Sequence, residues 1–192
     1  MYDIASATAA LLALSFAYPI GAVLGRVSEK EIKANKKLFF KLDLTLFSLF
    51  TLGSVFFATI YYPLAGILGV LFGLLLVRVA HHINKINVVA VIMGLSYVFG
   101  RLGFEIMTLL AMFYLLTRVA ITYYKHDDKK VIGKVIIDQL GFIVISFLFA
   151  FFVELFAVGG SVMWISLLIA LLATSMLIYD AEKFKPGKKP WF

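Results

Sequence analysis

Long uncharged apolar segments dominate the chain and alternate with short clusters of lysine and arginine. The first runs from Ile4 to Gly25, and a later one contains no charged residue over the 34 residues from Leu44 to Val77. A single helix of that length would be about 50 Å long, too long for one crossing of a ~30 Å hydrocarbon core. Tyr61-Tyr62-Pro63 lies near its middle, and proline interrupts helices. This segment therefore predicts a hairpin of two helices.

The same length argument divides the rest of the chain. A helix over 86–124 would be about 58 Å long, so we expect a turn at Gly100-Arg101-Leu102-Gly103, and Gly159-Gly160 separates the last two helices. The sequence predicts an all-α fold, with a single bundle of seven transmembrane helices in residues 1–182 and a basic tail in residues 183–192. The expected helices are approximately 4–25, 39–60, 63–80, 86–100, 103–124, 135–157 and 161–179, and the lysine-rich stretches 26–41 and 125–134 are expected to be loops.

Composition supports a membrane protein. Hydrophobic residues make up 62% of the chain, charged residues 15%, and the mean hydropathy is +1.00. Soluble domains are nearer 45–50% apolar and 25% charged, so a soluble, disordered or coiled-coil protein is excluded. The chain has no cysteine, which excludes disulfides, thiolate nucleophiles and cysteine metal sites. We expect a multi-pass protein of the cell membrane.

The basic residues predict the orientation of the helices. Of the 18 Lys and Arg residues, six lie in 26–41, two in 78–85, five in 118–134 and four in the tail; Arg101 alone lies on the opposite side. The positive-inside rule then places the N-terminus outside and the C-terminus in the cytoplasm. The net charge of +7 fits anionic lipid at the cytoplasmic face better than nucleic acid. The predicted membrane anchor in the tail is Lys185, Lys188, Lys189 and Trp191.

The first three and last three helices resemble each other weakly. Lys36-Lys37, Lys41 and Asp43 open the second helix, and Lys129-Lys130, Lys134 and Asp138 precede the sixth with similar spacing. This predicts a parallel repeat of three helices, one linking helix and three helices, an architecture found among transporters. The alternative is that every cytoplasmic helix start is rich in lysine.

Ionisable residues inside membrane spans are costly and often functional. Six are candidates for a transport pathway: Arg101, Glu105, Glu154, Arg118, Asp43 and Asp138. The first three are expected to form an outer cluster, because residues four apart share a helix face, and the last three an inner one. Structural alternatives exist for the inner set. Asp43 and Asp138 could stabilise helix N-termini. The Arg118 side chain could extend to the headgroups or form a salt bridge to one of the two aspartates.

Other motifs give weaker signals. His81-His82 and His126-Asp127-Asp128 contain metal-ligand residue types, but their spacing matches no metal site, so we predict solvated loops and no catalytic, metal or cofactor site. The glycines predict close helix packing. The aromatic residues are expected mostly to face lipid or the interface.

The function predicted from these features is a small transporter or channel that moves a small solute or ion by rocking of two helix bundles. The scarcity of polar groups near the bilayer midplane keeps two alternatives open: a non-transporting subunit or assembly factor, and a lipid-modifying enzyme acting through His126 and Asp127. The expected partners are the lipid bilayer and either further copies of the chain or another membrane-complex protein. The midplane polar residues are Ser48, Thr51, Ser96, Tyr97, Tyr114 and Ser146.

Overall fold

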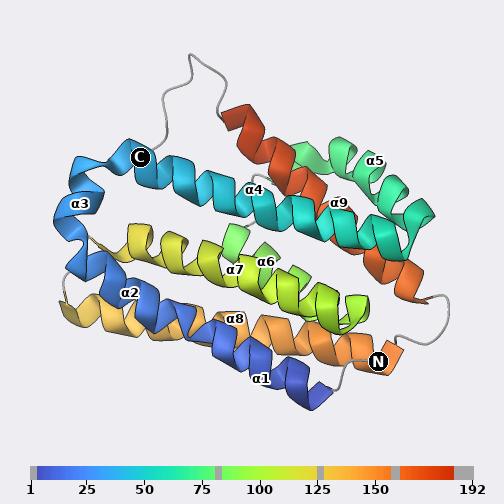
Figure 1. The fold of residues 1–192 in the computed structure, drawn as a ribbon, viewed down its shortest axis with the longest axis horizontal. Coiled ribbons are helices and arrows are strands. Elements are labelled where there is room, and N and C mark those ends of the chain that lie inside the picture. Colours follow the sequence, from blue (N-terminus) through green and yellow to red (C-terminus); the bar gives the residue numbers. More distant parts are fainter. Residues whose placement is uncertain (1–3, 81–83, 125–127, 157–160, 184–192) are drawn as a thin grey trace.

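Helices account for every regular element that the structure, a computed structural model, describes over residues 4–80, 84–124, 128–156 and 161–183. Most of the long helices lie along one axis of the molecule (Figure 1). The predicted seven-helix count fits the structure when α1 with α2, and α6 with η1, are each taken as one interrupted helix and the six-residue helix α3 is set aside. The elements are α1 Ile4–Ser15, α2 Ala17–Val27, α3 Glu29–Ala34, α4 Lys36–Tyr61, α5 Pro63–Ala80, α6 Lys85–Leu95, the 3-10 helix η1 Ser96–Phe99, α7 Gly100–Tyr123, α8 Asp128–Phe156 and α9 Ser161–Lys183.

Five helical stretches are long and apolar enough to cross a membrane, judged by length and composition. They are Ala5–Val27, Lys36–Tyr61, Lys85–Tyr123, Val131–Phe156 and Ser161–Asp180, and Pro63–Val77 is a shorter apolar helix. Several predicted features lie outside the described residues: the Gly159-Gly160 turn, both histidine motifs except Asp128, and the anchor residues Lys185, Lys188, Lys189 and Trp191.

The first predicted helix is broken at Phe16. Pro19 has no N–H with which to bond the carbonyl of Ser15, so the helical hydrogen-bond ladder is interrupted one turn before the proline. The Ser15 hydroxyl instead donates to the Leu12 carbonyl at 2.7 Å. The chain resumes as α2, which packs along α7.

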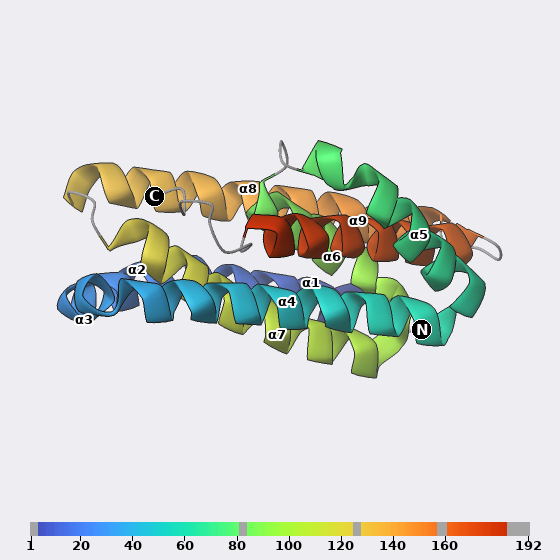
Figure 2. The same ribbon diagram turned by 90° about the horizontal axis from the view of Figure 1, so that it is seen from above.

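The predicted hairpin is confirmed. Tyr62 lies between α4 and α5 in an extended conformation, with φ −142° and ψ 82°, as expected for a residue before proline. From the turn, α5 runs back beside α9 (Figures 1 and 2). A Cβ atom on Gly69 would lie 2.5 Å from the Leu167 carbonyl oxygen, so the close contact between these helices requires glycine there.

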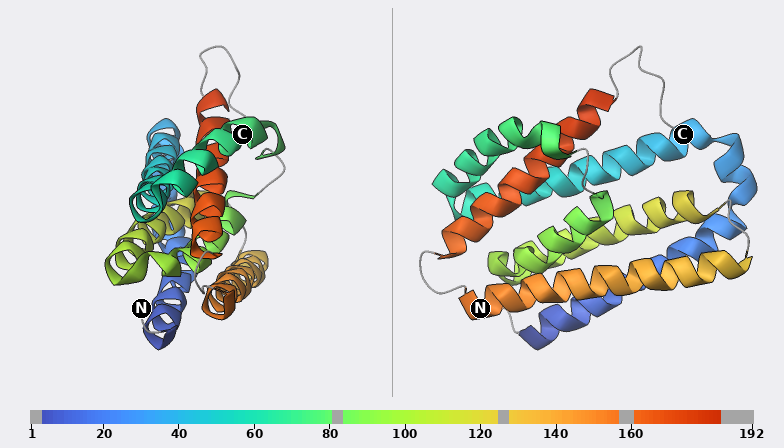
Figure 3. Two further views of the ribbon diagram at one scale, coloured as in Figure 1. Left: turned by 90° about the vertical axis from the view of Figure 1, so that its right-hand side faces the viewer. Right: turned by 180° about the vertical axis from the view of Figure 1, so that it is seen from behind.

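The short helix α6 lies inside the bundle, between α8 and α9 when seen from behind (Figure 3). The Asn84 side chain accepts a hydrogen bond from the Ile86 N–H at 3.0 Å and caps its start. Seven of its eleven residues are buried, which is typical of a helix that is apolar on all faces. Gly100, with φ +67°, turns the chain into α7, so the predicted turn begins here while the helix itself includes 100–103.

The stretches predicted as loops, 26–41 and 125–134, are helical over most of their described length. Helices α3, α4 and α8 begin within them, because lysine and glutamate are good helix formers once the apolar segment has ended. Asp43 is therefore the eighth residue of α4 and Asp138 the eleventh of α8. The helix dipole acts mainly within the first turn, and both residues lie beyond it. The alternative in which these aspartates stabilise a helix N-terminus is therefore wrong for both.

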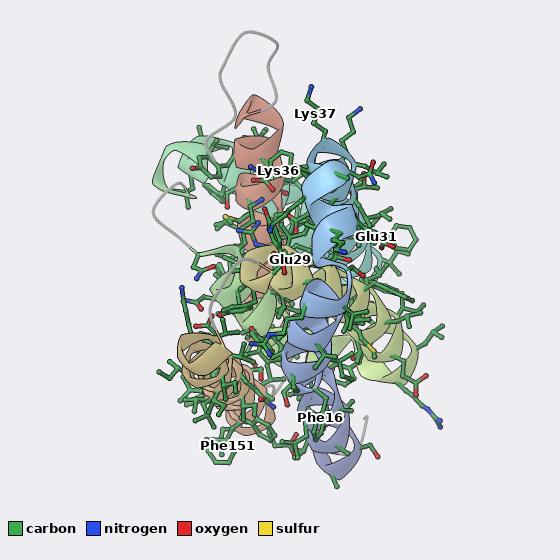
Figure 4. All side chains as sticks on the ribbon, turned by 90° about the vertical axis from the view of Figure 1, so that its left-hand side faces the viewer. Phe16, Glu29, Glu31, Lys36, Lys37 and Phe151 are labelled. Atoms are coloured by element: carbon green, nitrogen blue, oxygen red, sulfur yellow. The ribbon has the colours of Figure 1, made fainter. Side chains whose placement is uncertain are left out.

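The prediction that aromatic residues mostly face lipid holds only in part. Phe16 and Phe151 are exposed and point outward (Figure 4). Other rings fill the core because they pack against one another; the Phe47 and Tyr114 ring centroids, for example, are 5.1 Å apart. The largest fully buried aromatic residues are Tyr18, Tyr114, Tyr123, Phe47, Phe50, Phe99, Phe104 and Phe142.

The two helices that the repeat would relate have different neighbours. Helix α4 packs mainly on α9 and α7, whereas α8 packs mainly on α6 and α1. These contacts do not support the parallel repeat, which stays a prediction. The orientation across a membrane also stays a prediction.

Candidate ionic site

Four charged side chains from four helices form two ion pairs near the ends of α6 and α9. In the first pair, the Arg118 Nη1 atom on α7 donates to the Asp43 Oδ2 atom on α4 at 3.2 Å. In the second, the Lys85 Nζ atom at the start of α6 donates to the Asp180 Oδ2 atom on α9. We call these four residues the inner ionic cluster. The salt bridge to Asp43 is thus the arrangement that the structure adopts for Arg118.

The carboxylates of this cluster are buried and the cations are partly exposed. The side chains of Asp43 and Asp180 are 3% and 2% exposed, and those of Arg118 and Lys85 are 33% and 19% exposed. Desolvating a carboxylate this far is costly unless a cation and hydrogen bonds compensate it. Each carboxylate therefore depends on its partner helix for the charge that holds it.

Phe47 and longer-range electrostatics connect the two pairs. Phe47 lies one turn after Asp43 on α4, and the Lys85 Nζ atom is 4.9 Å from the centre of its ring, a distance typical of a cation–π interaction. Asp43 interacts electrostatically with Lys85 and with Asp180 as well as with Arg118. The two acidic and two basic groups therefore act as one network whose formal charges cancel.

Two buried polar atoms beside this network have no hydrogen-bond partner among the residues that the structure describes. They are the second carboxylate oxygen of Asp43, Oδ1, and the hydroxyl of Tyr114, which lies one turn before Arg118 on α7. Leaving such an atom unpaired costs about 1–3 kcal/mol. Buried polar atoms in proteins are usually bonded to protein, water or a ligand, so these two atoms are the buried groups beside the network whose hydrogen-bonding capacity the described residues leave unused.

A second polar group of residues lies where α1, α2, α7 and α8 meet. The Tyr123 hydroxyl donates to the Asp138 Oδ2 atom, and the Gln139 Nε2 atom donates to the Ser15 hydroxyl at 3.4 Å. The Tyr18 hydroxyl is buried without a hydrogen-bond partner. Asp138 is thus held by a tyrosine, and the structure does not bring it into the inner ionic cluster.

The predicted outer cluster is only partly assembled. Arg101 and Glu105 form the expected pair, with 2.9 Å between Nε and Oε1, but their side chains are 79% and 48% exposed. Glu154 is exposed near the end of α8 and forms no ion pair or hydrogen bond with the residues that the structure describes. A surface pair between neighbouring turns of one helix contributes little to stability.

Hydroxyl groups in the middle of the bundle are bonded to their own helices. The hydroxyls of Thr51, Ser96 and Ser146 each donate to a carbonyl oxygen three or four residues earlier. The Ser54 hydroxyl does the same with the Phe50 carbonyl at 2.8 Å. Over the described residues, the buried side-chain atoms left without a hydrogen-bond partner are Asp43 Oδ1 and the Tyr114 hydroxyl beside the inner ionic cluster, the Tyr18 hydroxyl in the second polar group and the Ser166 hydroxyl on α9.

Two of the four cluster residues, Asp43 and Arg118, are among the candidates predicted from the sequence, whereas Lys85 and Asp180 are not. Lys85 was expected in a loop, and Asp180 lies one residue beyond the predicted end of the last helix. These two residues are 95 positions apart, so no spacing rule connects them. The available signal was their common position at the predicted cytoplasmic ends of apolar segments, where opposite charges can meet.

Comparisons with known proteins give no match: no protein-family model, no curated protein and no solved structure is similar to this chain. Over the described ranges, no group of three or more His, Asp or Glu side chains could hold a metal ion. The inner ionic cluster is thus the feature from which a function can be inferred.

Proposed function

We propose that the protein is a multi-pass membrane protein of seven helices, with its N-terminus outside the cell membrane and its C-terminus in the cytoplasm. The five apolar stretches support this, as does the surface of α8, where only 22% of the apolar window is buried. A contiguous apolar surface of this length is rare on soluble monomers and suits contact with lipid tails. Its most exposed residues include Ile137, Val144, Leu148 and Phe151.

The orientation can be tested by cysteine labelling, because the chain has no cysteine of its own. Asn35 is exposed between α3 and α4, and Tyr61 is exposed at the other end of α4. We expect a membrane-impermeant maleimide to label Tyr61→Cys in intact cells and Asn35→Cys only after permeabilisation. The reverse pattern would overturn the orientation, and labelling of both in intact cells would overturn the membrane crossing by α4.

We further propose that the protein transports a small polar solute or ion through the inner ionic cluster. The observation that supports this is the pair of unpartnered atoms, Asp43 Oδ1 and the Tyr114 hydroxyl, beside a network of buried charges. Charged groups inside a membrane protein are costly to keep and commonly mark the path of an ion or solute. The four charged residues lie on four separate helices, so a bound solute would contact several helices at once.

The two ion pairs suggest how such a site could open. Arg118 and Lys85 supply hydrogen-bond donors, and Asp43 and Asp180 supply acceptors. A polar solute could replace one pair while the other stays closed, so that no buried charge is left without a partner. Relative movement of α4 and α7 against α6 and α9 would then accompany binding and release.

The test is flux in proteoliposomes that contain the purified chain. We would measure the dissipation of imposed proton, sodium, potassium and chloride gradients and the uptake of labelled amino acids and sugars. Asp43→Asn and Asp180→Asn should abolish the flux found with the unmodified chain, whereas Glu105→Gln and Glu154→Gln, which change exposed carboxylates, should retain it. Flux that survives both aspartate changes would remove the inner cluster from the pathway, and loss of flux in Glu105→Gln would move the pathway to the outer cluster.

The second candidate function is a non-transporting subunit of a membrane complex. It is favoured by the mid-bundle hydroxyls, which are bonded to their own helices and so offer little to a passing solute. This function predicts that a defined partner co-purifies with the chain in mild detergent, and a clean monomer or homo-oligomer argues against it. The lipid-modifying enzyme is tested by His126→Ala and Asp127→Ala, which should then abolish turnover of a phospholipid.

A further inference from the structure

We infer that Asp43 is a proton-binding site and that protonation releases its ion pair with Arg118. This inference deepens the proposed transport function, on which it rests, by naming the proton as the ion that the cluster handles. It starts from the environment of one carboxylate: Asp43 is buried, its Oδ2 atom accepts one hydrogen bond from Arg118, and its Oδ1 atom has no partner. Burial disfavours the charged form of a carboxylate, and at Asp43 a single hydrogen bond, from Arg118, offsets it.

The surrounding groups select a proton over other ions. Arg118 and Tyr114 of α7, Lys85 of α6 and Asp180 of α9 are the charged or titratable groups that interact with Asp43. Because the two cations and the two carboxylates cancel, the network attracts neither a metal cation nor an anion by net charge, and a metal cation would also require several oxygen ligands. A proton needs only one oxygen, and Asp43 Oδ1 has no hydrogen-bond partner among the described residues.

Protonation changes the balance of the network. A proton delivered by water bonds to Asp43 Oδ1 and converts the carboxylate to a neutral carboxylic acid. The contact between Arg118 and Oδ2 then changes from an ion pair to a hydrogen bond from a cation to a neutral acid, which is weaker. The Arg118 side chain is already 33% exposed and has a long stem that can carry its head toward the water.

The second ion pair remains when the first is released. Lys85 stays bonded to Asp180, so α6 and α9 keep their connection while α4 and α7 lose one. Proton binding would therefore loosen one side of the cluster selectively. The Tyr114 hydroxyl is a positioning group here: through a water it can hold the Oδ1 side of Asp43, and it does not itself carry the proton.

Infrared difference spectroscopy of the reconstituted protein tests this proposal without any need for flux. Acidification should produce a carbonyl stretch of a protonated carboxylic acid, shifted in heavy water, that is missing in Asp43→Asn and present in Asp138→Asn. Asp138 is a matched control because it is also a helical aspartate with a hydrogen bond to Oδ2. Asp43→Glu keeps a carboxyl group and serves if the asparagine variant does not fold; it should shift the frequency of the band. Tyr114→Phe should keep the band but change the pH at which the band reaches half of its full intensity.

The outcomes separate this inference from the transport proposal. A band that persists unchanged in both Asp43 variants, or no band over the pH range in which the protein stays folded, would overturn the proton site. An Asp43 band in a protein that shows no flux of any probe supports the proton site and contradicts transport. Flux that depends on Asp180 but not on pH, without an Asp43 band, contradicts the proton site and supports transport.

Discussion

Removal of Arg118 should destabilise the protein more than removal of its partner Asp43. The two side chains are 3.2 Å apart, and at an effective dielectric constant of about 20 their mutual attraction is about 5 kcal/mol. The cost of desolvating the two groups offsets most of that attraction. The net effect of a substitution therefore depends on what is left behind, and the two residues differ strongly in exposure.

Arg118→Met leaves a carboxylate that is 3% exposed without its ion-pair partner. Breaking a buried pair in this way typically costs 3–5 kcal/mol, and we expect about 3 kcal/mol because Lys85 still attracts Asp43. Asp43→Asn leaves an arginine that is 33% exposed and can turn toward water. The amide oxygen of the substituted side chain can still accept a hydrogen bond from Arg118, so the expected loss is about 1–2 kcal/mol, the difference between an ion pair and a hydrogen bond from a cation to a neutral amide.

The assay is reversible unfolding in mixed micelles, driven by an anionic detergent and followed by far-ultraviolet circular dichroism. Arg101→Met is the control, because its pair with Glu105 is exposed and should contribute less than about 1 kcal/mol. Equal losses in the two cluster variants, or the reverse order, would refute the reasoning from burial. A loss in Arg118→Met no larger than that of the control would show that Asp43 is already neutral under the conditions of the assay.

Three further predictions concern other parts of the molecule. Gly94→Ala should lower the unfolding free energy by about 1–3 kcal/mol, because its Cβ would lie 2.4 Å from the Ser146 carbonyl oxygen. Gly141→Ala should raise the unfolding free energy by roughly 0.5–1 kcal/mol, because a Cβ there would have nothing within 4 Å. Equal effects of the two substitutions would contradict the packing of α6 on α8. Tyr18→Phe should raise the unfolding free energy by about 1 kcal/mol, because its hydroxyl is buried without a partner, and a loss would reveal a bound water or ligand there. Lys33 donates a hydrogen bond to Glu29 and so lowers the pKa of that carboxyl, which means that the stabilisation of α3 is present above the ordinary glutamate pKa and is lost as the pH falls through the lowered value. A spin label on α3 should gain mobility over that range, and Glu29→Gln should remove the response.

The helices could be predicted because their signal is local. The 34 uncharged residues between Leu44 and Val77 exceed the length of one membrane crossing, and Pro63 marks where the chain turns back. These facts need no knowledge of the rest of the fold. The helix ends were harder to predict, because a lysine-rich stretch such as the one that begins at Lys36 favours helix as readily as loop, and that error produced the alternative in which Asp43 stabilises a helix N-terminus.

The partners of the charged residues could not be predicted in the same way. Arg118 and Asp43 are 75 positions apart, and Lys85 and Asp180 are 95 apart. Nothing in the sequence between them indicates which helices become neighbours. The neighbours of α6 were equally hard to predict. Its apolar residues favour a helix without a polar face, but they do not indicate which helices surround it.

The inner ionic cluster and the exposed pair of Arg101 and Glu105 differ in how they respond to movement of the helices. The exposed pair lies on two neighbouring turns of α7, so its geometry stays the same however the helices move relative to one another. Each pair of the inner cluster joins two different helices, and a shift of either helix changes the distance between buried charges. Because electrostatic energies are large where water is excluded, even a small shift alters the stability of the network, and the occupancy of the site and the arrangement of α4, α6, α7 and α9 are coupled. The proposed transport function needs such coupling between binding and helix movement, and ion pairs that join different helices allow it whereas a pair within one helix does not.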